Sequence, residues 1–165
     1  MCLAEIHHRG KKLQAFAKDI SRGRVAVATE ADPSGRSDRG TSGGVAVLAS
    51  SSLDVTLPNG SSSSFGCWQS PQDSAFLVGL QVNLRQGQTL QVFSSYHLDE
   101  PSAEVLATVH KRTQGGALPF LLLGDYNMDR RDFEAKHQHW LLGLNAVTIG
   151  CNEGTCSLGQ KLELD

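Results

Sequence analysis

"PFLLLGDYNMDRR", residues 119–131, is the stretch that decides the fold. Four apolar residues break at a glycine and are followed by Asp125 and Asn127, two positions apart. A run this apolar predicts a strand buried on both faces, in a layered protein whose helices pack on sheets. The carboxylate and the amide at the end of that strand could hold a charged group. They could also serve only as turn residues or as the cap of the following helix.

The composition predicts one globular domain. The 165 residues suffice for a sizeable core, and 39% are hydrophobic and 19% charged. A net charge of −2 excludes a global basic field, so any nucleic-acid binding must come from a local patch such as "HHRGKK" at 7–12. The N-terminus does not resemble a secretory signal, and no apolar stretch approaches the roughly 20 residues of a membrane span. The expectation is an intracellular protein with free thiols at its four scattered cysteines.

The periodicity of the remaining sequence indicates a mixed α/β or α+β order. A Ser- and Gly-rich stretch at 49–66 predicts a flexible loop. Asp99 is the expected cap of a helix that carries Val105, Leu106 and Val109 on one side. The other expected elements are a helix at 10–22, strands at 25–29 and 40–50, a hairpin of 75–84 with 89–98, and a helix at 132–144 with His137 on its apolar stripe.

Four stretches together carry a family resemblance. They are "LAEIHHRGKK" at 3–12, "VFSSYHLDE" at 92–100, "LLLGDYNMD" at 121–129 and "KLELD" at 161–165. Their order and spacing resemble the endonuclease/exonuclease/phosphatase superfamily, with its glutamate motif, its tyrosine or histidine strand and its Gly-Asp-aromatic-Asn motif. The resemblance implies an α+β fold, a four-layer α/β/β/α sandwich of two mixed sheets flanked by helices. It also implies hydrolysis of a phosphate ester with Mg²⁺ or Mn²⁺.

The resemblance also implies roles for single residues. Glu5 corresponds to the metal-binding carboxylate, and Asp125 to the group that orients or deprotonates the attacking water. Asn127 corresponds to an amide that holds phosphate and water, and Tyr96 to a group that contacts the scissile phosphate. The remaining candidates are Asp165, which matches the acid behind the catalytic histidine, and Arg9, Lys11 and His97 as substrate-binding residues.

Each assignment has a plainer alternative. Glu5 alone would be a surface acid, and Tyr96 could simply plug the edge of the sheet. Strand alternation allows only one of Tyr96 and His97 to face the site. His7 and His8 are expected to be solvated, and His137 to lie at the edge of the core.

The motifs at either end of this family are missing from the sequence. Neither the first strand with its metal-organising Asn or Asp nor the closing Ser-Asp-His motif has a counterpart in residues 1–165. The expectation is therefore a single domain that is incomplete at both ends, whose activity as it stands is in question. The favoured function is a nuclease-like phosphodiesterase acting on DNA or RNA, with a retroelement-type endonuclease as one form of it, and with no membrane partner and no sign of a homo-oligomer. The alternatives are a phosphatase of the inositol-phosphate type and a catalytically dead binding module of the same fold.

Overall fold

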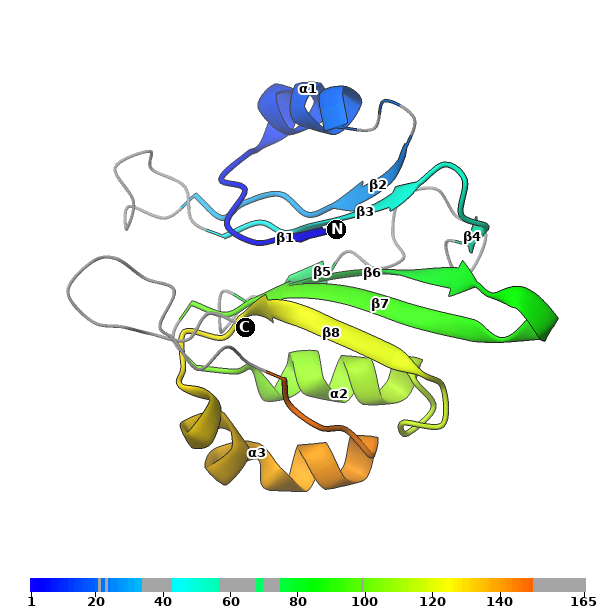
Figure 1. The fold of residues 1–165 in the computed structure, drawn as a ribbon. Helices are drawn as coiled ribbons and strands as arrows, with labels where there is room; N and C mark the ends of the chain where they lie inside the picture. The colour runs from blue at the N-terminus through cyan, green and yellow to red at the C-terminus, as the bar shows by residue number, and fades with distance from the viewer. Residues whose placement is uncertain are drawn as a thin grey trace.

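Two β-sheets lie face to face, with helices on the outside of both (Figure 1). The computed structural model describes residues 1–20, 22, 24–33, 43–56, 68–69, 75–98 and 100–149. This arrangement is the four-layer α/β/β/α sandwich that the sequence predicted. Within the described ranges, no helix has the length and apolar character needed to cross a membrane.

The smaller sheet is antiparallel in the order β1-β3-β2. Its strands are β1 (Cys2–Leu3), β2 (Arg24–Ala28) and β3 (Ala46–Ser50). Helix α1 (Gly10–Ile20) lies on the outer face of this sheet, and its predicted apolar stripe at 13, 16, 17 and 20 is half-buried. The helix ends two residues earlier than predicted, and the two-residue β1 is too short to leave a pattern in the sequence.

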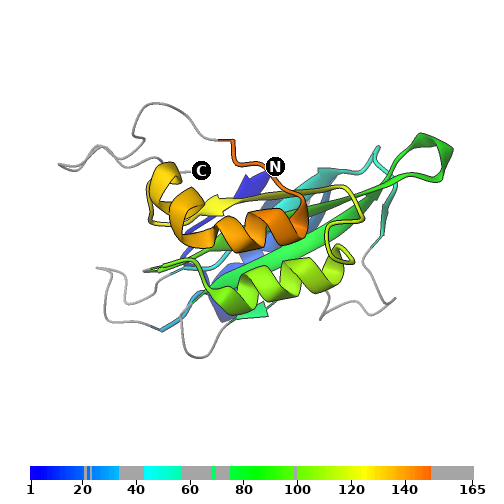
Figure 2. The ribbon, with the colours of Figure 1, turned by 90° about the horizontal axis from the view of Figure 1, so that it is seen from below.

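The larger sheet is mixed, in the order β4-β6-β7-β8, with β5 also paired to β6. The predicted hairpin is formed by β6 (Phe76–Asn83) and β7 (Thr89–Tyr96) around the short helix η1 (Arg85–Gly87). The chain then crosses through α2 (Ala103–Arg112) to β8 (Phe120–Asp125), which runs parallel to β7. Helices α2 and α3 (Arg130–Leu144) lie across the outer face of this sheet (Figure 2). The other two strands are β4 (Val55–Thr56) and β5 (Trp68–Gln69).

Apolar side chains fill the spaces on both sides of the larger sheet. Between the sheets, Val47 of β3 and Val45 just before it pack against Phe76, Val78 and Leu80 of β6, and all five are at most 1% exposed. On the helix side, Leu77 and Phe93 pack against buried residues of α2 and α3. The larger sheet therefore holds both layers together, and its strand ends are positioned by two cores.

The structure corrects the expectation that the apolar strand at 119–125 is buried on both faces. Leu121 and Leu123 of β8 are 46% and 43% exposed, whereas Phe120 and Leu122 pack against the helix-side core. Because β8 is the last strand in the order of its sheet, the core between the sheets, built on β3, β6 and β7, does not extend over its two leucines. In the described part of the chain, a strand with apolar residues on both faces thus lies at the edge of its sheet.

The start of helix α2 also differs from the prediction. Ser102, and not Asp99, is the N-cap, because its hydroxyl accepts a hydrogen bond from the Val105 backbone N–H. Asp99 lies outside the described residues. Pro101 explains the shift, since a residue that precedes a proline is disfavoured in the α conformation and the helix can begin only after it.

Candidate functional site

Tyr96 and Asp125 lie side by side at the ends of two parallel strands. Tyr96 is the last residue of β7 and Asp125 the last residue of β8, and the register pairs them directly. Paired residues of neighbouring strands point to the same face of a sheet. Tyr96 belongs to the core between the sheets, so Asp125 also faces the other sheet.

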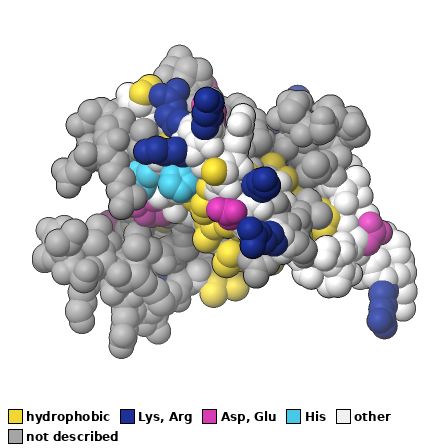
Figure 3. Space-filling model, turned by 90° about the horizontal axis from the view of Figure 1, so that it is seen from above, with side chains coloured by type: hydrophobic (Ala, Val, Ile, Leu, Met, Phe, Trp, Pro, Cys, Tyr) yellow, Lys and Arg dark blue, Asp and Glu magenta, His cyan; other side chains and the backbone are white. Residues whose placement is uncertain are grey.

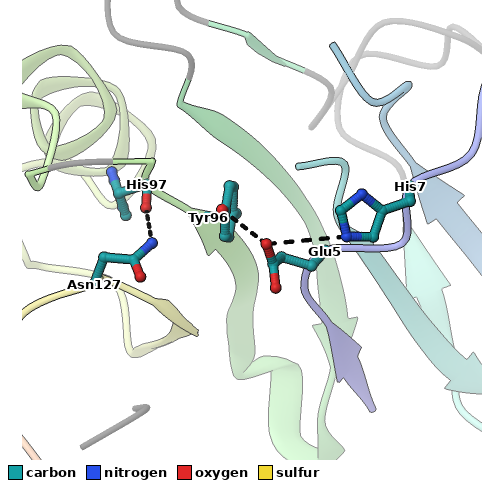
Figure 4. A network of polar contacts seen from close by, with 5 residues as sticks. All are labelled: Glu5, His7, Tyr96, His97 and Asn127. Carbon is teal, nitrogen blue, oxygen red and sulfur yellow. Dashed lines mark hydrogen bonds and ion pairs between the residues drawn. The ribbon is translucent and has the colours of Figure 1, made fainter. Parts of the chain in front are cut away.

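Glu5 reaches the same place from the smaller sheet. It follows β1, and its Oε1 accepts a 2.9 Å hydrogen bond from the Tyr96 hydroxyl (Figure 4). The tyrosine is only 3% exposed, while the glutamate side chain is 46% exposed. The bond therefore joins the two sheets at the rim of the sandwich, with the carboxylate still open to solvent.

Asp125 and Asn127 form a tight turn at the end of β8. The Asp125 Oδ1 accepts a 2.9 Å hydrogen bond from the Asn127 backbone N–H, and Asn127 has a left-handed φ of 47°. The Asn127 Nδ2 donates to the carbonyl oxygen of His97. In the described part of the chain the Asn127 Oδ1 accepts no hydrogen bond, so this oxygen is available to a ligand.

The surroundings of Asp125 shift the pKa of its carboxyl. Burial raises the pKa of the Asp125 carboxyl above its usual range. The hydrogen bond from the Asn127 backbone lowers this pKa, and the negative charge of Glu5 raises it again. Two carboxylates thus lie close enough to repel each other at the rim of the sandwich.

His97 has a different position from Tyr96, as strand alternation requires. Its side chain is fully buried, its Nδ1 accepts a 3.1 Å hydrogen bond from the Ser102 N–H, and its ring stacks on Tyr126 at 5.0 Å. These contacts hold the start of α2 against the turn after β8. His97 thus holds Asn127 through its backbone carbonyl, while its side chain is buried between the start of α2 and the turn after β8.

The loop that carries Glu5 is strained and tightly held. Glu5 and His7 both have left-handed backbones, with φ of 53° and 51°, which costs a non-glycine residue about 1–2 kcal/mol. The N–H groups of Ile6 and His7 donate 3.1 Å hydrogen bonds to the carbonyls of Gly44 and Gly43. A Cβ at Gly44 would approach Ile6 Cγ1 to 2.9 Å, so only glycine permits this close packing of the loop on the strand.

His7 was not among the predicted site residues, yet its ring faces Glu5. Its Nε2 lies 4.0 Å from the Glu5 Oε1, and its side chain is 22% exposed (Figure 4). The neighbouring His8 turns toward α1, where its ring contacts Phe16 edge-on at 4.9 Å. The spacing of His7 two residues after Glu5 was the one signal in the sequence that could have separated the two histidines.

The basic residues near Glu5 lie at the start of α1. Arg9 pairs with Glu30 at 3.9 Å, and Glu30 also accepts the Gly10 backbone N–H at 3.1 Å. Lys11 is exposed in the first turn of the helix. Seen from above α1, Lys and Arg side chains gather beside histidine side chains (Figure 3). Asp165, the remaining candidate, lies outside the described residues.

The rim offers oxygen atoms for a divalent cation. Within the described ranges no cluster of three His, Cys, Asp or Glu side chains has the arrangement of a metal site. The donors that do come together are the carboxylates of Glu5 and Asp125 with the free amide oxygen of Asn127. Mg²⁺ fits such a set, because it prefers oxygen and usually takes one or two carboxylates while keeping several waters.

Comparison with known proteins confirms the fold. No protein-family model and no curated protein matches the sequence. The structure of the human Nocturnin catalytic domain with bound sulfate is similar with a TM-score of 0.54 at 15% identity, over 99% of this chain and 66% of that one. The endonuclease domain of TRAS1, a telomere-specific non-LTR retrotransposon, matches with a TM-score of 0.49 at 19% identity, over 87% of this chain and 64% of that one. The Nocturnin domain has the endonuclease/exonuclease/phosphatase fold, and the chain shares that fold over about two thirds of the length of that domain.

Proposed function

We propose that the rim formed by Glu5, Tyr96, Asp125 and Asn127 is the hydrolytic site of a metal-dependent phosphodiesterase that acts on nucleic acid. The observation that carries the proposal is the convergence of these side chains from both sheets. Glu5 follows β1 of one sheet, whereas Tyr96 and Asp125 end two paired strands of the other. The fold, which the chain shares with the Nocturnin catalytic domain, supports the same class of reaction.

A divalent cation fits the charge of this site. The Glu5 carboxylate lies close enough to Asp125 for its charge to raise the pKa of Asp125, and neither carboxylate forms an ion pair with a Lys or Arg side chain in the described part of the chain. A phosphodiester brought to the same rim adds a third negative charge. Glu5 would hold Mg²⁺ or Mn²⁺ through its exposed carboxylate, and the bound cation would neutralise charge on the phosphate oxygens.

Asp125 is the proposed general base. Burial raises the pKa of its carboxyl, and a base whose pKa is closer to the working pH takes a proton more readily. A water molecule attacks the phosphorus and gives its proton to Asp125, and the bond from phosphorus to the leaving oxygen breaks. The leaving alkoxide takes a proton from solvent. The free Oδ1 of Asn127 would accept a hydrogen bond from that water and fix its direction.

Tyr96, Arg9 and Lys11 are the proposed residues for positioning the nucleic-acid substrate. The Tyr96 hydroxyl donates to Glu5, so it fixes the carboxylate and stands next to the position of the phosphate. Arg9 and Lys11 are exposed at the start of α1, a few residues after Glu5, and would contact neighbouring phosphates of a polynucleotide. Phosphate contacts of this kind position a nucleic acid without reading its sequence.

The test is the nicking of supercoiled plasmid by the chain, with Mg²⁺ and with EDTA. We expect Mg²⁺-dependent nicking that falls on the order of 10²-fold or more in Asp125→Asn and Glu5→Gln. Glu104→Gln is the matched control, because Glu104 is an exposed carboxylate in the first turn of α2, on the outer layer of the sandwich. Nicking that persists in Asp125→Asn would show a contaminating nuclease. Absence of nicking in a folded protein would refute the nuclease assignment and favour a binding module of the same fold.

A further inference from the structure

We propose that His7 is a substrate-contacting residue of the site, whose imidazole holds an oxygen of the phosphate that Glu5 and Asp125 process. This inference rests on the proposed function, because it names a further contact at the same rim. It begins from the two consecutive histidines, whose rings the structure places differently, His7 beside Glu5 and His8 against α1.

The backbone of residues 5–7 is the first argument. Glu5 and His7 both occupy the left-handed region, which side chains other than glycine rarely adopt. Strain of this kind persists only where the surroundings enforce it, and it gathers at functional sites. Here the carbonyls of Gly43 and Gly44 enforce it through hydrogen bonds to the two residues after Glu5. The result is that Glu5 and His7 point to the same place.

The position of the ring is the second argument. His7 Nε2 lies 4.0 Å from Glu5 Oε1, a distance too long for a hydrogen bond between the two. An oxygen of a ligand held beside the Glu5 carboxylate would come within reach of this Nε2. The ring also stays 22% exposed, so solvent and ligand can approach it (Figure 4).

The neighbouring residues show that this orientation is specific to one histidine. The ring of His8 contacts Phe16 of α1, and its carbonyl accepts a 3.0 Å hydrogen bond from Ala31. His8 therefore anchors the loop to the helix and to the smaller sheet. His8 thus fixes the loop, whereas His7 faces the rim. A substitution of His8 is therefore a matched control for a substitution of His7.

The first arm of the test measures phosphate contact directly. Inorganic phosphate is added to the folded chain in the presence of Mg²⁺, and the imidazole resonances of the histidines are followed by NMR, with His7→Gln and His8→Gln used to assign them. We expect the His7 signals to shift with phosphate and the His8 signals to stay in place. If the His7 signals do not move, the inference is wrong, whether or not the chain nicks plasmid.

The second arm measures the reaction. His7→Ala should lower nicking on the order of 10²-fold, the usual effect of losing one donor to a phosphoryl or acyl oxygen. His7→Gln, which can place an amide N–H near the same position, should recover part of the loss. His8→Gln, which changes the ring contact with Phe16 of α1 and removes no group from the rim, should lower nicking less than His7→Ala does. Nicking that is unchanged in His7→Ala would overturn the proposal and leave the hydrolytic site intact. If the unmodified chain does not nick plasmid but its His7 signal shifts with phosphate, the proposed hydrolysis is refuted and the phosphate contact of His7 stands.

Discussion

The hydrogen bond between Tyr96 and Glu5 allows a test that needs no substrate. It is 2.9 Å long, and it joins a tyrosine that is 3% exposed to a carboxylate whose side chain is 46% exposed. A hydrogen bond to a charged group contributes about 1.5–3 kcal/mol to stability. Because water can reach the carboxylate and screens its charge, we expect less than this range, about 1 kcal/mol.

The perturbation is a double-mutant cycle of Tyr96→Phe and Glu5→Ala. Phenylalanine keeps the ring packing against Phe76, whose centroid lies 6.1 Å away, so the first change removes only the hydroxyl. Each single variant should lose about 1 kcal/mol, and the double variant little more than one of them. In thermal unfolding, 1 kcal/mol corresponds to a fall of about 2–4 °C for a domain of this size.

Denaturant unfolding followed by circular dichroism measures the cycle. The same cycle with Tyr126→Phe in place of Tyr96→Phe is the control, because Tyr126 packs against His97 and Phe133 on the other side of the sheet. We expect no coupling between Tyr126 and Glu5. A coupling energy between Tyr96 and Glu5 within about 0.3 kcal/mol of zero would refute the reasoning, since it would mean that the contact does not hold the two sheets together at the rim.

Two further predictions concern the same rim. Asp125→Asn should stabilise the fold at neutral pH. Because the pKa of Asp125 is raised in the folded state, the stability that its protonated carboxyl contributes is fully present below the ordinary pKa of 3.8 and is lost as the pH rises through the folded pKa. The free energy of unfolding of both proteins, measured across the pH range, should therefore show that the variant is more stable only above the folded pKa, and an equal stabilisation at pH 3 would contradict the prediction. Gly44→Ala should destabilise the fold by about 1–3 kcal/mol, because the Gly44 φ of 82° and the 2.9 Å approach of a Cβ to Ile6 leave no room for a methyl group. Nicking by this variant should also fall, because the loop that carries Glu5 would shift. A free energy of unfolding equal to that of the unmodified chain, measured with the same denaturant method, would disprove the close packing.

The layers of the fold could be predicted from the sequence because long patterned elements carry them. The stripe of α1 and the hairpin of β6 with β7 occur close to where the periodicity places them. The two-residue strands β1, β4 and β5 could not be predicted, because two residues form no pattern. The exposure of Leu121 and Leu123 could not be predicted either, because it depends on which strand lies at the edge of the sheet. The sequence of an apolar strand does not show which strands lie beside it.

The candidate site was predicted for a different reason. Glu5, Tyr96, Asp125 and Asn127 were found through their order along the chain, and the structure brings all four to one rim. The side chain of His97 could not be placed by motif, because the choice between it and Tyr96 depends on the register of β7 with the sheets around it. Ser102 was missed as the cap of α2 because the composition offered Asp99 first, and only the backbone restriction imposed by Pro101 decides between them.

The places where the chain departs from local rules lie together, and this is the strongest reason to regard the rim as functional. Six non-glycine residues with a left-handed backbone occur in the described ranges, and three of them, Glu5, His7 and Asn127, surround the rim. The same rim holds two carboxylates that repel each other, one of them with a pKa raised by burial. Each feature lowers stability, and a fold selected for stability alone would have glycine or a neutral side chain at such positions. Local conflicts that survive at one point of an otherwise consistent fold indicate that the point was selected for another property, which in our proposal is the handling of an anionic ligand.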